Sequence, residues 1–275
     1  GNLLPLQNAV YIVGDVQARL IIQRRKRLVQ QQDIRPCGQC ADERHALAET
    51  GLRVMQIGCD PKADSTLSLR QGQPMETVLD LIRTKPGGPQ LEEMVRIGYG
   101  GVACVEAGGP TPGMGCAGRG IIAALEKLAQ QRAYEVYKPD VVFYDVLGDV
   151  VCGGFAMPMR SGYADRVFIL TSGENMALHA AANIAMAVEQ FRGRGYATLG
   201  GLILNCRQVP RELEKVQELA QDIGADLTGI LPRSQTVQDA ETMGKTVLEA
   251  FPDSEMAACY RRLAQTVLQR CEVAP

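Results

Sequence analysis

Three polar loops follow short apolar runs in the sequence, and their side chains could take part in phosphate chemistry. The loops are residues 60–65 (DPKADS), 145–149 (DVLGD) and 205–207 (NCR). If the runs are parallel strands, their carboxyl ends meet in one crevice, where ligands bind in open sheets of this kind. An Asp at a strand end can hold Mg²⁺ through water beside a nucleotide phosphate. One such Asp is more often a helix cap or turn, but three loops in phase favour a shared ligand site.

Two of the nine cysteines, Cys116 in GCAGRG and Cys152 in VCGGF, lie among glycines. Small neighbours allow backbone N–H groups to approach a sulfur-ligated cluster and tune its potential. A [4Fe–4S] cluster needs four thiolates, so one chain would supply too few. A symmetric dimer would supply two from each subunit at its two-fold axis.

The other cysteines carry weaker signals. An odd number of cysteines without a secretion signal argues against a disulfide scaffold, and two histidines leave little for histidine-based metal sites. The pair in CGQC, Cys37 and Cys40, is weak support for zinc or redox chemistry because no second pair accompanies it. We interpret the remaining five as packing residues, with the last two near or at the surface: Cys59, Cys104, Cys206, Cys259 and Cys271.

The composition argues against two classes of protein. The chain has 275 residues, of which 46% are hydrophobic and 22% charged, with a net charge of −2. A nucleic-acid-binding protein needs a basic face to neutralise phosphates, which this charge balance does not favour. No apolar run approaches the roughly 20 residues that span a bilayer. We therefore expect a cytoplasmic protein with neither nucleic acid nor membrane as a partner.

From about residue 46, short apolar runs alternate with amphipathic stretches, which is typical of a parallel sheet with helical crossovers. The expected strands are 53–58, 102–106, 140–144, 166–170, 199–204 and 226–231. The expected helices are 75–84, 118–131, 175–192, 211–223 and 254–270. We therefore predict one doubly wound α/β domain over residues 46–275, with a mainly parallel sheet and helices on both faces.

Residues 1–45 form an atypical N-terminal segment. They hold a candidate strand at Ala9–Val13 and then a basic, glutamine-rich run from QRRKR to QQQ. Such a run is more typical of a solvated helix face than of a nucleic-acid patch.

Three longer stretches resemble, in the same order, the nitrogenase iron protein family, whose members are also called dinitrogenase reductases. They are CDPKADST, GYGGVACVEAGGPTPGMGCAGRG and YDVLGDVVCGGFAMP. The resemblance covers roughly residues 46–268 and implies a P-loop NTPase-like fold. Related reductases of tetrapyrrole biosynthesis share DVLGDVVCGGF, whereas the arginine of GCAGRG and the methionine of GGFAMP are more similar to the nitrogenase branch.

The resemblance implies a homodimer with one [4Fe–4S] cluster, held by Cys116 and Cys152 of each subunit, and MgATP in each subunit. ATP hydrolysis would drive single-electron transfer to a larger nitrogenase-type catalytic component for N₂ reduction. Ferredoxin or flavodoxin would be the electron donor. Arg119 would lie on the docking face beside the cluster, at the position that is ADP-ribosylated in some members.

Residue by residue, the resemblance assigns residues 60–64, with Lys62, to the first nucleotide switch. Asp60 would lie near the attacking water and Asp64 near Mg²⁺. Asp145 would contact Mg²⁺ through water. Residues 145–149, ending at Asp149, would form the second switch, from which only a short stretch of chain leads to Cys152. The adenine would be bound by a further set of residues: Asn205, Pro232, Arg233 and Gln238.

The sequence departs from the family at the phosphate loop. Members open with a loop of the form GKGGIGKS about 20–30 residues before DPKADS, where this chain has QQQDIRPCGQC at residues 30–40. The glycines, both lysines and the Mg²⁺-binding serine are missing, and no later segment replaces them. We therefore expect this chain to bind and hydrolyse ATP poorly or not at all.

Two explanations of this departure compete. One is a diverged homologue that lost its nucleotide chemistry while keeping every switch residue. The other, which we favour, is a frameshift or misread gene, with the correct frame resuming near residues 41–46. Misread GGN codons give NGG, often arginine, and misread AAR codons give NAA, often glutamine, which would produce a run such as QRRKR.

Three functions stay open. The first is the ATP-dependent iron–sulfur reductase of nitrogenase, impaired in this chain. The second is a nitrogenase-like reductase for another substrate, such as a tetrapyrrole. The third is a non-catalytic protein that binds a cluster and cannot use ATP.

Overall fold

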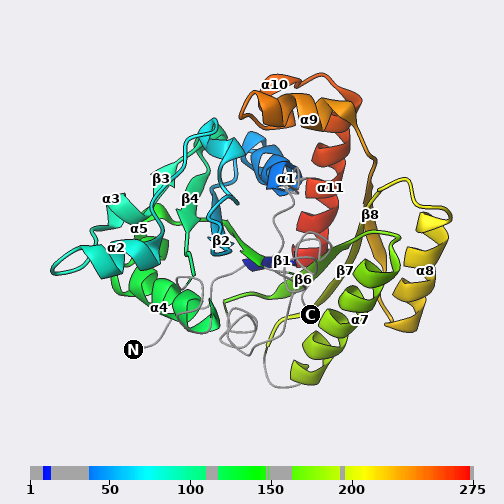
Figure 1. Cartoon of the computed structure of the whole chain (residues 1–275), viewed down its shortest axis with the longest axis horizontal. Coiled ribbons are helices and arrows are strands. Elements are labelled where there is room, and N and C mark those ends of the chain that lie inside the picture. The colour runs from blue at the N-terminus through cyan, green and yellow to red at the C-terminus, as the bar shows by residue number, and fades with distance from the viewer. Residues whose placement is uncertain are drawn as a thin grey trace, which may run out of the picture.

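The computed structural model describes residues 9–13, 37–109, 117–146, 148, 163–192 and 196–272. Its centre is an 8-stranded sheet in the order β3-β4-β2-β5-β1-β6-β7-β8 (Figure 1). Neighbouring strands pair in parallel, except that β3 runs antiparallel to β4 at one edge. The carboxyl ends of the seven parallel strands therefore share one edge of the sheet.

The strands agree closely with the sequence prediction, because buried parallel strands are recognisable as apolar runs. Their bounds are β1 Ala9–Val13, β2 Val54–Cys59, β3 Arg96–Ile97, β4 Ala103–Glu106, β5 Val141–Val146, β6 Arg166–Thr171, β7 Thr198–Asn205 and β8 Leu227–Leu231. The candidate strand at Ala9–Val13 is confirmed and lies between β5 and β6. The two-residue strand β3 was not predicted.

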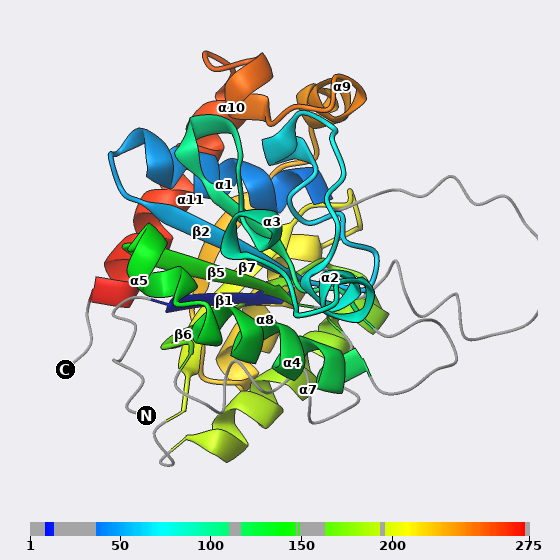
Figure 2. The same ribbon diagram turned by 90° about the vertical axis from the view of Figure 1, so that its left-hand side faces the viewer.

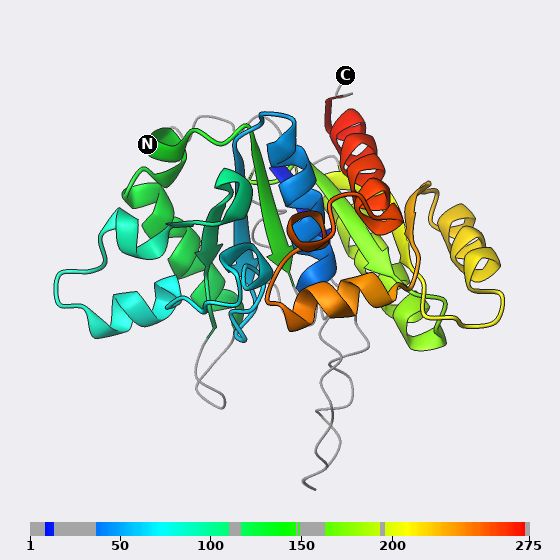
Figure 3. The same ribbon diagram turned by 90° about the horizontal axis from the view of Figure 1, so that it is seen from above.

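Helices cover both faces of the sheet, as Figures 2 and 3 show. Their bounds are α1 Cys37–Glu49, η2 Ser68–Arg70, α2 Val78–Thr84, α3 Leu91–Met94, η3 Tyr99–Gly101, α4 Ala117–Gln130, α5 Ala133–Tyr137, α7 Asn175–Phe191, α8 Glu212–Asp222, α9 Gln235–Thr242, α10 Val247–Ala250 and α11 Glu255–Glu272. One core cluster joins the sheet to α4, α7 and α8, and the other joins it to α1, α9, α10 and α11. The predicted doubly wound architecture is confirmed.

The alternation of side chains along each strand decides which polar residues face α1. Val54, Cys104 and Phe143 belong to the core under α1 and α11. Because successive side chains point to opposite faces, Gln56, Glu106 and Asp145 lie on this same face. The α1 face is therefore apolar in its middle and polar towards the carboxyl edge.

Helix α1 was not predicted, and its composition explains why. Four consecutive polar residues, Asp42 to His45, are at most 4% exposed. A run of four covers every side of a helix, so no apolar stripe marks this element in the sequence. The Arg44 guanidinium lies 4.8 Å from the centre of the Phe143 ring. Helix α1 crosses the expected boundary at residue 45, and the division into two segments stays a prediction.

Among the described residues, no helix is long and apolar enough to cross a membrane.

Candidate functional site

Three strand ends meet in one row at the carboxyl edge of the sheet. Gly58 of β2 is level with Glu106 of β4 on one side and with Asp145 of β5 on the other. A Cβ on Gly58 would lie 2.1 Å from Glu106 Oε2 and 2.6 Å from Ser65 Cβ. Because Gly58 has no side chain, the side chains of Ser65 and Glu106 can pack directly against its backbone.

Ser65 connects the first predicted loop to the second. Its Oγ donates a hydrogen bond to Asp145 Oδ2 at 2.5 Å and accepts one from Gln56 Nε2 at 2.6 Å. Gln56 Nε2 also donates to the Ser65 carbonyl at 2.7 Å. A buried hydroxyl and a carboxylate oxygen side by side are hard oxygen donors, the ligand type that Mg²⁺ prefers. These donors fit the predicted magnesium position beside Asp145.

Glu106 and Thr66 form the other half of this polar cluster. Glu106 Oε1 accepts hydrogen bonds from the Thr66 backbone N–H at 2.7 Å and from the Thr66 hydroxyl at 2.6 Å. Burial raises the pKa of Glu106 to about 8, with Asp145 and Asp64 adding to the rise and Thr66 opposing it. The Glu106 carboxyl is therefore mostly protonated at neutral pH.

Short-range hydrogen bonds to Asp60 hold the loop at residues 60–65 in a tight turn. Asp60 is 8% exposed, and its Oδ1 accepts a hydrogen bond from the Lys62 N–H at 3.0 Å. Its carbonyl accepts one from the N–H of Ala63, which has a positive φ of 53°. The Lys62 side chain is exposed, and Asp64 is half-buried. The loop places a buried carboxylate at its start and an exposed cation beside it.

The residues predicted to bind adenine lie farther along the same edge. Asn205 ends β7 and is 2% exposed, and its Nδ2 has no hydrogen-bond partner among the residues that the structure describes. It is level with Leu231, the residue before Pro232 and Arg233, both of which are exposed. Gln238 is exposed on α9. Three strand spacings separate β5 from β7, roughly 14 Å, and a buried donor without a partner fits recognition of a base.

Comparison with known proteins decides the family. A family model described as 4Fe-4S iron sulfur cluster binding proteins, NifH/frxC family, matches residues 37–275. The chain belongs to this family. Nitrogenase iron protein 2 of Methanothermobacter thermautotrophicus is 50% identical over 220 residues, 80% of each chain. A nitrogenase iron protein of Methanospirillum hungatei is 50% identical over 226 residues, 81% of this chain and 80% of the relative. The resemblance predicted from the sequence is confirmed.

Solved structures confirm the P-loop NTPase-like fold. The cell division ATPase MinD of Pyrococcus furiosus superposes with a TM-score of 0.66 at 16% identity, over 96% of this chain and 99% of MinD. A ParA family ATPase from Chlorobium tepidum gives a TM-score of 0.64 at 14% identity, over 94% and 98% of the two chains. At such low identities the likeness concerns the fold alone.

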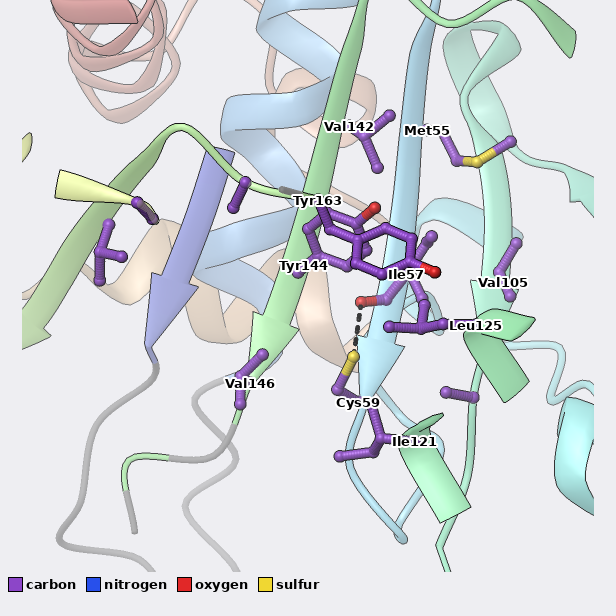
Figure 4. Packing of buried hydrophobic residues seen from close by; sticks show 14 of the residues in the cluster. Met55, Ile57, Cys59, Val105, Ile121, Leu125, Val142, Tyr144, Val146 and Tyr163 are labelled. Atoms are coloured by element: carbon purple, nitrogen blue, oxygen red, sulfur yellow. Dashed lines mark hydrogen bonds between the residues drawn. The ribbon is translucent and has the colours of Figure 1, made fainter. Parts of the chain in front are cut away.

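The predicted cluster ligands of this NifH/frxC family member, Cys116 and Cys152, lie outside the described residues, as does Asp149. Cys116 directly precedes α4, and Cys152 follows the end of β5 at Val146. Figure 4 shows Val146, Cys59 at the end of β2 and Ile121 of α4 in one apolar cluster. Ile121, in the first turns of α4, and Val146, at the end of β5, therefore belong to the same core cluster. Arg119 is exposed in the first turn of α4.

The cysteines interpreted as packing residues behave in two ways. Cys59, Cys104 and Cys271 are buried, and burial raises the pKa of Cys104 to about 12. Cys206 and Cys259 are only partly buried, and burial raises the pKa of Cys206 to about 11. Among the described residues, no group of three or more His, Cys, Asp or Glu side chains could hold a metal ion.

Sequence reasoning missed the residues that tie the loops together. In the sequence, Gln56 and Glu106 lie inside expected strands, and Thr66 ends the motif CDPKADST. A glutamate that closes the apolar run VACVE was a usable signal, because a buried carboxyl at a strand end needs a partner.

Proposed function

We propose that this chain is an iron–sulfur reductase subunit of the nitrogenase type, impaired in its use of ATP. The observation that carries the proposal is the 50% identity to nitrogenase iron protein 2 over 220 residues. The polar cluster at the carboxyl edge supports it, because Ser65, the residue after the predicted first switch, donates a hydrogen bond to Asp145 of the predicted second switch.

Cys116 and Cys152 of two subunits would hold one [4Fe–4S] cluster at a two-fold axis. Cys116 directly precedes α4 and Cys152 follows β5 by six residues, and Ile121 of α4 and Val146 of β5 belong to one core cluster. The N-terminus of α4 carries a partial positive charge that favours an anionic cluster. When bound, the cluster supplies a one-electron redox centre. Arg119 would lie beside it on the surface that meets the catalytic component.

In the nucleotide half of the site, Asp145 and Ser65 would hold Mg²⁺, and Asn205 would donate its amide N–H to the base. Asp60 would orient the water, with Lys62, Asp64 and Asp149 completing the two switches. Pro232, Arg233 and Gln238 would border the base. The phosphates lack their usual cradle, because residues 14–36 contain neither a glycine-rich loop nor its Lys-Ser ending. Binding of MgATP is therefore expected to be weak.

A homodimer, a larger nitrogenase-type catalytic component and a ferredoxin or flavodoxin donor complete the proposal. It is tested by mixing reduced, cluster-loaded protein with such a catalytic component and MgATP while following oxidation of the cluster. We expect no MgATP-driven oxidation with this chain. We expect it with a variant in which GKGGIGKS replaces the residues between β1 and α1. Failure of both proteins would contradict the reductase function.

A second candidate is a cluster-binding homologue without catalysis, which the missing phosphate loop favours. It predicts a full complement of iron and no response of the restored variant to MgATP. A reductase for a tetrapyrrole is distinguished by the catalytic component that oxidises the cluster of the restored variant.

A further inference from the structure

The loop at residues 60–66 is fastened at its far end by Glu106. Thr66 donates both its backbone N–H and its hydroxyl to one carboxyl oxygen, Glu106 Oε1, at 2.7 and 2.6 Å. Both residues are at most 1% exposed. Hydrogen bonds shielded in this way are not exchanged freely for water, so the two residues are held together.

The same loop touches the chain beyond Glu106 at its near end. A Cβ on Gly109 would lie 2.4 Å from Pro61 Cγ, so Gly109 packs directly on the Pro61 ring. Between these contacts, the Ala107 N–H donates to the Gly58 carbonyl at 2.7 Å. Residues 106–109 therefore follow the loop along its length, and the chain then continues towards Cys116.

We propose that Glu106 is a positioning residue that couples the first nucleotide switch to the segment leading to Cys116. A displacement of residues 60–66 would move Thr66 and Pro61, and their contacts with Glu106 and Gly109 would transmit this movement to residues 106–109. This path is separate from the one through Asp145 towards Cys152, because it runs along β4 instead of β5. The cluster side of the proposal rests on the proposed function, whereas the fastening of the two segments does not.

The carboxyl group suits this task better than an apolar side chain would. One oxygen accepts both donors of Thr66, and the other, Oε2, lies against Gly58 and has no hydrogen-bond partner within the described parts of the chain. Because burial raises the pKa of Glu106 to about 8, a neutral amide is its closest isostere. Glu106→Gln should therefore keep the fastening, and Glu106→Ala should break it.

Hydrogen exchange of the protein without cluster or nucleotide tests the fastening. Thr66→Val removes the hydroxyl donor on one segment, and the amides of residues 107–109 on the other segment are the readout. We expect these amides to exchange about tenfold faster, the factor for loss of one buried hydrogen bond. In Thr66→Ser and in Glu106→Gln, which keep a donor and an acceptor, these amides should exchange as slowly as in the unmodified protein. Thr228→Val is the matched control, because Thr228 is a buried threonine on β8 whose hydroxyl donates to Gly200.

Faster exchange confined to residues 60–67 in Thr66→Val would overturn the proposal, since Thr66 would then stabilise only its own loop. Unchanged exchange in both Thr66→Val and Glu106→Ala would also overturn it. If Glu106→Ala does not fold, the comparison of Thr66→Val with Thr66→Ser still tests the proposal.

A second readout concerns the cluster. Once cluster is loaded, a chelator should remove iron several-fold faster from Thr66→Val than from Thr66→Ser, and equal rates would overturn the coupling to Cys116. A chain that takes up no cluster would instead contradict the proposed function, and the exchange result would stand on its own.

Discussion

Glu106 and Asp145 lie level with each other on either side of Gly58, on the same face of the sheet. Ser65 donates to Asp145, and the next residue, Thr66, donates to Glu106. Two adjacent residues of one loop are thus bound to two carboxyl groups on different strands. The loop that contains the predicted first nucleotide switch is thus held on both sides by β4 and β5, the strands that precede the two predicted cluster ligands in the sequence.

Gly58→Ala should destabilise the protein by about 1–3 kcal/mol, because the new methyl group overlaps Glu106 Oε2 and Ser65 Cβ. Urea denaturation measures this loss. Glu106→Ala removes part of this overlap. The double variant Gly58→Ala, Glu106→Ala should therefore lose less unfolding free energy than the sum of the losses in the two single variants. Strict additivity would contradict the close packing around Gly58.

The pH dependence of stability should reveal Glu43 on α1. Burial raises its pKa from 4.5 to about 7, with Arg44 opposing the rise and Asp145 adding to it. The native protein therefore keeps a proton that the unfolded chain loses, and stability falls as pH rises from 4.5 to 7. The contribution amounts to about 3 kcal/mol, and is fully lost above pH 7.

Glu43→Gln should remove this loss, so the difference in unfolding free energy between pH 5 and pH 8 should shrink relative to the unmodified protein. Glu135→Gln, at an exposed position on α5, is the control and should leave the difference as it was. An identical pH profile for Glu43→Gln would show that Glu43 is not buried as a neutral acid.

The sequence predicted the sheet well and helix α1 not at all, for opposite physical reasons. Strands such as Val141–Val146 are buried on both faces and are continuous apolar runs. Helix α1 buries Asp42, Glu43, Arg44 and His45, which a residue pattern assigns to solvent. Short elements, such as α10 at Val247–Ala250, offer too few turns for a periodic signal.

Parts of the site were predictable and parts were not. Asp60, Asp145 and Asn205 follow apolar runs. If these runs are parallel strands, all three residues must lie at the carboxyl edge of the sheet. The partnership of Ser65 with Asp145, and of Thr66 with Glu106, joins residues far apart in the chain. Only the register between strands brings such residues together, and no local pattern encodes it.

The basic, glutamine-rich run at residues 14–36, where relatives carry the phosphate loop, is the reason to predict a misread N-terminal segment. We predict that another frame of the DNA encoding residues 1–50 contains a GKGGxGKS-type loop. Sequencing and translation of all three frames tests this. Absence of the loop from every frame would favour a genuine loss and the non-catalytic homologue.

Calorimetric titration with MgATP should show weak or undetectable binding. The missing phosphate loop removes several charge-assisted hydrogen bonds, each contributing roughly 1.5–3 kcal/mol. Ordinary nucleoside triphosphate affinity would contradict the assignment of phosphate binding to that loop. The variant that carries GKGGIGKS between β1 and α1 should gain affinity, and Asn205→Ala in that variant should lower it again.

The proposed cluster is tested directly by the iron content of the protein after anaerobic reconstitution, measured on the same sample as its molecular mass. We predict four irons per two chains, a dimer that depends on the cluster, and loss of both in Cys116→Ser and Cys152→Ser. Cys259→Ser, at a partly buried position on α11, should keep both. A cluster retained in the Cys116→Ser, Cys152→Ser double variant, or an iron-free chain, would contradict the proposed iron–sulfur reductase.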